Sequence, residues 1–195
     1  MPQKNPPVLD FLKRSAHALG VLNDVGLLSP SYMISMARGA RESGPSTAIG
    51  VFGGRHYRGS QTAIIDDAGT TTFAQLRTRT LSIAQGLRAA GVGPGHNVGI
   101  LARNHRGFVE ATSAAAILGT DSLFLNTGFA GPQLGEVLKR EGAGTLIYDQ
   151  EFSGIVEQAA SGLQRFLAWT DREPDVPTLD HLARENAPEA PPRPE

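Results

Sequence analysis

Short apolar runs alternate with longer segments of helical periodicity from residue 61 to about residue 185. Such runs are typical of buried strands, and apolar residues spaced every three or four positions are typical of helices. The predicted strands cover residues 62–66, 97–104, 121–127, 144–149 and 165–170. The predicted helices cover residues 72–90, 107–118, a segment beginning at Pro132, 151–161 and the stretch TLDHLARENA. Strands that alternate with helices imply right-handed crossovers, so we expect an α/β fold with a mostly parallel sheet and flanking helices.

The first 60 residues lack this regular rhythm. Apolar spacing predicts an amphipathic helix near residues 8–19 and a second helix near residues 32–40, whereas the glycine-rich residues 43–60 are interpreted as a connector. The stretch NAPEAPPRPE at the end has four prolines in ten residues, which is typical of an extended linker. The expected division is a helical N-terminal extension and connector (1–60), an α/β subdomain (61–185) and a proline-rich linker or tail (186–195).

Composition and charge exclude several classes of protein. The 18 basic and 19 acidic residues give a net charge of −1, which provides no general attraction to nucleic acid. Cysteine is absent, so there is no disulfide framework, thiolate nucleophile or cysteine-ligated metal. No apolar run approaches the ~20 residues of a membrane span. The first apolar stretch is interrupted by Asp10, Lys13 and Arg14, unlike a secretory signal. We therefore expect a cytoplasmic protein with no membrane span and no nucleic-acid partner.

The stretch LRAAGVGPGHNVGILARN (87–104) is the strongest candidate for a phosphate-binding loop, because it contains four glycines. A dinucleotide fingerprint requires G-x-G-x-x-G between a strand and the start of a helix. Here His96 occupies the sixth position, and the order is reversed, since a helix ends and a strand begins. The carboxyl end of a helix repels phosphate. We therefore interpret Gly91 as a helix cap followed by a tight turn.

Other candidate motifs are also incomplete. Gly69-Thr70-Thr71 lacks a following Gly-Lys pair, and Thr72 with Gln75 instead fits a helix capping box. GPSTA (44–48) is one residue short of a nucleophile elbow, and RHYR (55–58) is too short for a nucleic-acid footprint. Asp66 and Asp67 point to opposite sides of a strand end, which makes them poor candidates for paired acid–base work. The histidines share no helical metal-ligand spacing and are interpreted as surface residues; they are His17, His56, His96, His105 and His181. No catalytic, cofactor-binding or metal-binding residue is assigned.

The order of segments resembles the beginning of an AMP-forming adenylating enzyme, with the fatty acyl-CoA synthetases as the most similar branch. Residues 72–76, TFAQL, match the first core motif, Thr-(aromatic)-x-x-Leu. GVGPGHNVGILARN matches the turn and strand that follow it. ILGTDSLFLNTGF matches the second core motif, which ends in Leu125-Asn126-Thr127. The similarity covers about residues 62–170.

The resemblance implies a ligase in which a carboxylate, such as a fatty acid, reacts with ATP to form an acyl-adenylate and release pyrophosphate. The thiol of coenzyme A then displaces AMP to form a thioester. It implies ATP, Mg²⁺ and coenzyme A as the cofactors of the full-length family. The family's phosphate loop, adenine- and ribose-binding motifs and C-terminal lysine domain have no counterpart before Glu195. We therefore expect this chain, by itself, to hold no cofactor and to be catalytically inactive.

Three alternatives remain open. The chain is one half of a split synthetase with a complementing chain, a non-enzymatic interaction module held at membranes by the 8–19 helix, or a gene remnant. The first predicts a partner at an open sheet edge. The second is weakened because only Lys13, Arg14 and His17 lie on the polar side of that helix. The third rests on departures from the family pattern at His96 and Phe124.

Overall fold

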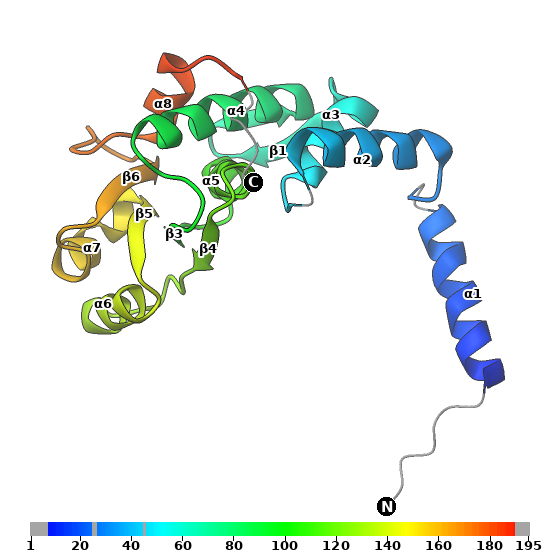
Figure 1. Ribbon diagram of the computed structural model, residues 1–195, viewed down its shortest axis with the longest axis horizontal. Helices are drawn as coiled ribbons and strands as arrows, with labels where there is room; N and C mark the ends of the chain where they lie inside the picture. The colour runs from blue at the N-terminus through cyan, green and yellow to red at the C-terminus, as the bar shows by residue number, and fades with distance from the viewer. Residues whose placement is uncertain (1–7, 25–26, 45, 190–195) are drawn as a thin grey trace, which may run out of the picture.

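The computed structural model describes residues 8–24, 27–44 and 46–189 (Figure 1). The elements in chain order are α1 (Val8–Asp24), α2 (Pro30–Ser43), α3 (Ile49–Arg58), β1 (Thr62–Asp66), β2 (Gly69–Thr72), α4 (Phe73–Ala89), β3 (Asn97–Leu101), α5 (Arg106–Ile117), β4 (Asp121–Phe124), α6 (Gly131–Arg140), β5 (Ala143–Asp149), η1 (Gln150–Phe152), α7 (Ser153–Ala159), β6 (Gln164–Trp169) and α8 (Leu179–Glu185). Every predicted strand is present, and the predicted α/β class is confirmed.

The main sheet has four parallel strands in the order β4-β3-β5-β6. Our expectation that residues 62–66 form the first strand of this sheet is wrong. This strand, β1, instead pairs with β2 as an antiparallel hairpin, in which Asp66 lies opposite Gly69. The two-residue turn between them leaves no room for a crossover helix, so the strands run antiparallel. Strand β2 is short and consists of GTTT, which gives no apolar pattern by which the sequence could predict it.

Helices cover both faces of the parallel sheet (Figure 1). Along β5 the side chains alternate between two apolar clusters, with Ile147 in one and Leu146 and Tyr148 in the other. The first cluster also contains the inner faces of α4, α5 and α8, and the second contains those of α6 and α7. A strand buried on both faces is continuously apolar, which explains the uninterrupted sequence TLIY.

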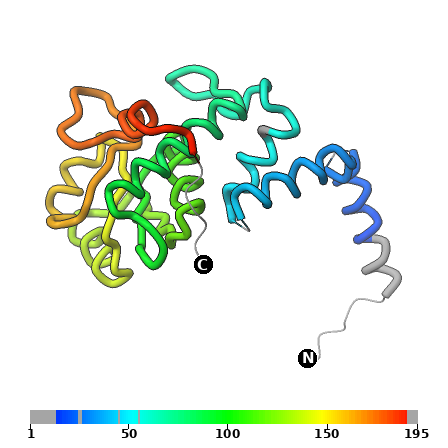
Figure 2. The backbone as a smooth tube through the Cα atoms, turned by 45° about the horizontal axis from the view of Figure 1, so that its top comes forward, coloured from blue at the N-terminus to red at the C-terminus, as the bar shows by residue number. Residues whose placement is uncertain are grey.

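The N-terminal helices lead away from these layers (Figure 2). The predicted helices near residues 8–19 and 32–40 are confirmed, and both are longer than expected. The interpretation of residues 43–60 as a connector is wrong, because Ile49–Arg58 forms α3. Its glycines predict a break, but the helix buries Val51 and Phe52 and packs along α2. Tertiary packing therefore overrides low helix propensity here.

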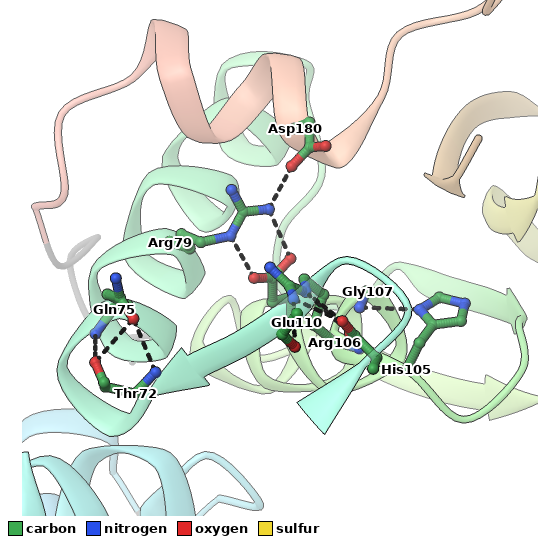
Figure 3. A network of polar contacts seen from close by, with 10 residues as sticks. Thr72, Gln75, Arg79, His105, Arg106, Gly107, Glu110 and Asp180 are labelled. Carbon is green, nitrogen blue, oxygen red and sulfur yellow. Dashed lines mark hydrogen bonds and ion pairs between the residues drawn. The ribbon is translucent and has the colours of Figure 1, made fainter. Parts of the chain in front are cut away.

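Both ends of α4 show the capping chemistry that its sequence predicts. The Gln75 amide donates to Thr72 Oγ1 at 3.2 Å, and the Thr72 amide donates to Gln75 Oε1 at 2.9 Å (Figure 3). At the other end Gly91 has a φ of 91°, and the Val92 amide donates to the Leu87 carbonyl at 2.9 Å. This is a Schellman cap, which confirms that the glycine-rich stretch ends a helix.

The proline-rich tail is described only as far as Glu189. Residues 187–189 are exposed and form no helix or strand; the Glu189 amide donates to the Ala187 carbonyl at 2.8 Å, and the Gln85 side chain donates to the Glu189 carbonyl at 3.0 Å. The rest of the predicted linker lies outside the described residues. Among the helices that the structure describes, none has the length and hydropathy needed to cross a bilayer.

Candidate functional site

A cavity of about 480 Å³ opens at the carboxyl ends of the parallel strands. After β3 the chain passes to β4 on one side of it and then to β5 on the other, which creates a topological switch point between β3 and β5. Ligands of open α/β sheets bind in the crevice at such a point. The crevice is lined by Ile65, Asp66, Asp67, Arg103, Asn104, His105, Asp149, Glu151, Trp169 and Asp171. The glycine-rich turn before Asn97 lies at the opposite, amino end of β3.

Asp149, the last residue of β5, connects the loops that form the crevice. Its side chain is almost completely buried. One carboxylate oxygen accepts from the Arg103 amide at 2.7 Å, and the other accepts from His105 Nε2 at 3.0 Å. These bonds fix the loop after β3 against the end of β5. A buried carboxylate needs such donors, since an unpaired buried charge is strongly destabilising.

His105 is a structural residue of the crevice. Its Nδ1 accepts from the Gly107 amide at 3.1 Å and caps α5, which leaves the proton on Nε2 for Asp149 (Figure 3). The ring packs at 4.8 Å from that of Trp169, and only 11% of the side chain is exposed. Both ring nitrogens are occupied, so His105 has no free nitrogen with which to act as a general base.

The interpretation of every histidine as a surface residue is therefore wrong for His105. It is also wrong for His56, which is partly buried and pairs with Glu42. His17, His96 and His181 are exposed, as expected. His56 and His105 are partly buried by residues far away in the sequence, which a local sequence pattern does not show.

Asp66 attaches the β1–β2 hairpin to the crevice. Its carboxylate accepts from the Arg106 amide at 2.9 Å and from Arg106 Nη2 at 2.6 Å. Hydrogen bonds from the Arg106 side chain outweigh desolvation and hold the pKa of Asp66 at about 2. Its neighbour Asp67 is exposed and has no hydrogen-bond partner among the described residues. The two carboxylates thus have unlike environments.

Asp66→Asn should lower the free energy of unfolding by about 2 kcal/mol at pH 7. Because the folded-state pKa of Asp66 is depressed, its contribution is present above the unfolded pKa, near 3.8, and is lost as the pH falls toward 2. Urea unfolding at pH 7 and at pH 2.5 (about the folded pKa) tests this, since the difference between variant and parent should shrink at the lower pH. Asp67→Asn is the matched control, and its effect should stay within about 0.5 kcal/mol. An equal loss for both variants would contradict the assignment.

The crevice is acidic, which determines the ligands that it favours. Five carboxylates line it, and Arg103, the one arginine among the lining residues, already pairs with Glu151 through an Nη2–Oε2 bond of 2.7 Å. The side chains of Asp67, Asn104 and Asp171 make no hydrogen bonds within the described part of the chain. Such a lining favours hydrogen-bond donors and disfavours phosphates. In residues 8–24, 27–44 and 46–189, no group of three or more acidic or histidine side chains is placed to hold a metal ion.

A second polar network holds three helices together beside the crevice (Figure 3). Arg79 of α4 donates to Glu110 of α5 at 2.5 Å and to Asp180 of α8 at 2.5 Å. Glu110 is almost completely buried, and this burial raises its pKa although Arg79 acts in the opposite direction. No local sequence pattern predicts this network, because its members are far apart along the chain.

Sequence reasoning also missed Asn104, Asp149 and Trp169. An indication was available, since Asn104 and Asp149 end predicted strands and Trp169 is the next-to-last residue of another. The carboxyl ends of parallel strands meet at one edge of a sheet, and polar residues at that edge are candidates for a ligand site.

Comparison with known proteins places the chain in a family. Residues 55–194 match the family described as AMP-binding enzyme, and the chain therefore belongs to it. A feruloyl-CoA synthase from an Amycolatopsis species is 35% identical over 124 residues, which is 60% of this chain and 25% of that protein. A fatty acid–[acyl-carrier-protein] ligase from Streptomyces coeruleorubidus is 26% identical over 136 residues, which is 66% of this chain and 26% of that protein.

Solved structures show the same fold. A benzoate CoA ligase from Burkholderia xenovorans superposes with a TM-score of 0.63 at 26% identity, over 70% of this chain and 27% of that chain. A fatty acyl CoA synthetase from Mycobacterium tuberculosis gives 0.58 at 19% identity, over 83% and 29% of the two chains, which supports the fold alone. The chain spans about a quarter of the length of the curated relatives that it matches. It thus corresponds to part of an adenylate-forming enzyme.

Proposed function

We propose that this chain forms the N-terminal portion of an acyl- or aryl-CoA ligase. Such an enzyme activates a carboxylate with ATP to an acyl-adenylate and then forms a thioester with coenzyme A. The observation that carries the proposal is the family match over residues 55–194, within which the parallel sheet and its flanking helices lie. Relatives are named for ferulate, benzoate and fatty acids, so we extend the expected substrate from fatty acids to aromatic carboxylates.

Within such an enzyme this chain would act as a scaffold. The crevice at the switch point does not fit ATP or Mg²⁺, because it is acidic and the described residues offer no metal-binding group. His105 is held by Asp149 and Gly107, and Asp66 is held by Arg106. These groups order the carboxyl edge of the sheet and do not supply a free acid, base or nucleophile. We therefore propose that the chain by itself is catalytically incomplete.

Carboxylate-dependent ATP–pyrophosphate exchange tests this proposal. Purified chain should give no exchange above background with ferulate, benzoate or a long-chain fatty acid, since the described residues provide no phosphate cradle. A feruloyl-CoA synthase assayed in parallel serves as the positive control. Exchange that depends on both the carboxylate and the chain would overturn the claim of incompleteness.

A split synthetase is the second candidate, and the edge of the sheet favours it. Strand β4 has β3 as its only partner strand among the described residues, and 59% of Phe124 at its end is exposed. An unpaired strand edge beside an exposed aromatic ring is suited to contact with another chain. Exchange should then appear when a second polypeptide of the same family, isolated with this chain, is added. Phe124→Glu should abolish that gain.

A further inference from the structure

Exposed apolar side chains gather on the N-terminal helices. Among the described residues, six large apolar side chains between residues 19 and 34 are 37–55% exposed. They are Leu19, Val21, Leu22, Leu28, Met33 and Ile34. Ile65 and Phe124 are the others of this kind, and they lie on separate elements. We refer to α1 and α2 together as the N-terminal arm, which leads away from the α/β layers (Figure 2).

In the part of helix α1 whose side chains the structure describes, residues 16–24 pack against no other element. All side chains from Ala16 to Asp24 are exposed. Its apolar residues nevertheless follow helical spacing, with Leu19 and Leu22 on one side of the sequence pattern and His17 and Asp24 on the other. An amphipathic helix of 17 residues is stabilised mainly by burying its apolar side. The exposed apolar side of α1 is therefore a candidate binding surface.

Helix α2 has an inner and an outer face of different chemistry. The inner face, with Ser35 and Gly39, packs on α3. Glu42, the one acidic residue of α2, is held by Arg77 and His56. The outer face combines the exposed apolar residues with two exposed arginines, and it consists of Met33, Ile34, Ala37, Arg38 and Arg41. Neither of these arginines forms an ion pair with the residues that the structure describes.

The net positive charge of the N-terminal arm indicates which binding partner it fits. The first 41 residues contain five basic and two acidic side chains, although the whole chain has 18 basic and 19 acidic residues. Basic residues beside exposed apolar ones, on α1 and on the outer face of α2, match the surface of an anionic bilayer, where phosphate headgroups lie beside acyl chains. We propose that the N-terminal arm binds the surface of an anionic lipid bilayer, with α1 and α2 lying at the interface. Two helices contribute, so the apolar area exceeds that of the 8–19 segment alone.

Vesicle flotation of the whole chain tests the proposal. The chain should float with vesicles of mixed phosphatidylglycerol and phosphatidylcholine, and less with phosphatidylcholine alone or in high salt. Arg38→Glu with Arg41→Glu should weaken binding to the anionic vesicles by about tenfold or more. Leu19→Glu with Leu22→Glu should also weaken it, because glutamate removes the inserting apolar side chains. All four positions are exposed, so the fold should persist, and circular dichroism checks this.

The matched control is Ile65→Glu with Phe124→Glu, which changes two apolar residues away from the arm that are more exposed than Leu19 and Leu22. This control should leave flotation unchanged. Absence of binding to anionic vesicles, or equal losses in arm and control variants, would overturn the proposal. A lipid-free dimer that the arm variants dissociate, without an effect of lipid, would assign the arm to a second copy instead. None of these outcomes depends on ligase activity.

Discussion

Replacing Arg79 by leucine should lower the free energy of unfolding by about 3 kcal/mol at pH 7. The guanidinium is the direct hydrogen-bonding partner of Glu110, whose side chain is only 1% exposed. Without Arg79 the carboxylate would be buried and uncompensated, which is much more costly than losing an exposed ion pair. Urea unfolding at constant pH measures the loss.

The loss should also depend on pH, with a defined sign. Burial already raises the pKa of Glu110, and removing Arg79 should raise it further. The folded variant then binds this proton more tightly than the folded parent does, so its deficit relative to the parent grows as the pH rises through the raised folded-state pKa of Glu110 in the parent, which lies above the usual value of 4.5. At pH 4 the deficit should be smaller than at pH 7. A loss independent of pH would show that packing, and not the buried charge, dominates.

Two variants distinguish the effect of the buried charge on stability from the effect of side-chain packing. Arg77→Leu, which removes an arginine from a more exposed pair with Glu42, should cost about 1 kcal/mol or less. Combining Arg79→Leu with Glu110→Leu should recover much of the loss, because apolar replacements of a buried pair are often neutral. A double variant as unstable as the sum of its parts would contradict this account.

Gly39→Ala should destabilise the packing of α2 on α3 by about 2 kcal/mol. A Cβ at Gly39 would lie 2.5 Å from the Gly53 nitrogen and 2.8 Å from its Cα, so the two helix backbones would have to separate. Thermal unfolding and hydrogen exchange of α2 amides measure the effect.

Gly50→Ala provides a control of opposite sign in the neighbouring helix. A Cβ at Gly50 meets nothing within 4 Å, so alanine should stabilise α3 by about 0.5 kcal/mol through its higher helix propensity. If both substitutions shift stability in the same direction, close contact at Gly39 is not the reason for its glycine.

The periodic part of the chain was predictable because its signals are local. The alternation of TLIY-type strands with amphipathic helices predicts the parallel sheet, and Thr72 with Gln75 predicts the start of α4. The N-terminal helix α3 was not predictable in this way, since Gly53 and Gly54 weaken its local pattern. They are tolerated because Gly53 lies against α2 and Gly54 against Phe73.

Prediction of the crevice from the sequence is limited for the same reason, because its contacts are not local. Asp149 and Arg103 are separated along the chain, and only the crossover connections bring them to one edge of the sheet. The pairing of His105 with Asp149 likewise depends on the neighbouring positions of β3 and β5. The sequence therefore predicted the framework and the family, whereas the polar connections required the three-dimensional arrangement.

We propose that this chain is the N-terminal portion of an acyl- or aryl-CoA ligase, in which it acts as a scaffold. The most direct measurement is ATP–pyrophosphate exchange by a chimera in which residues 55–194 replace the matching segment of a feruloyl-CoA synthase. We expect ferulate-dependent exchange by the chimera and none by this chain alone. A folded, soluble chimera without exchange would contradict the claim.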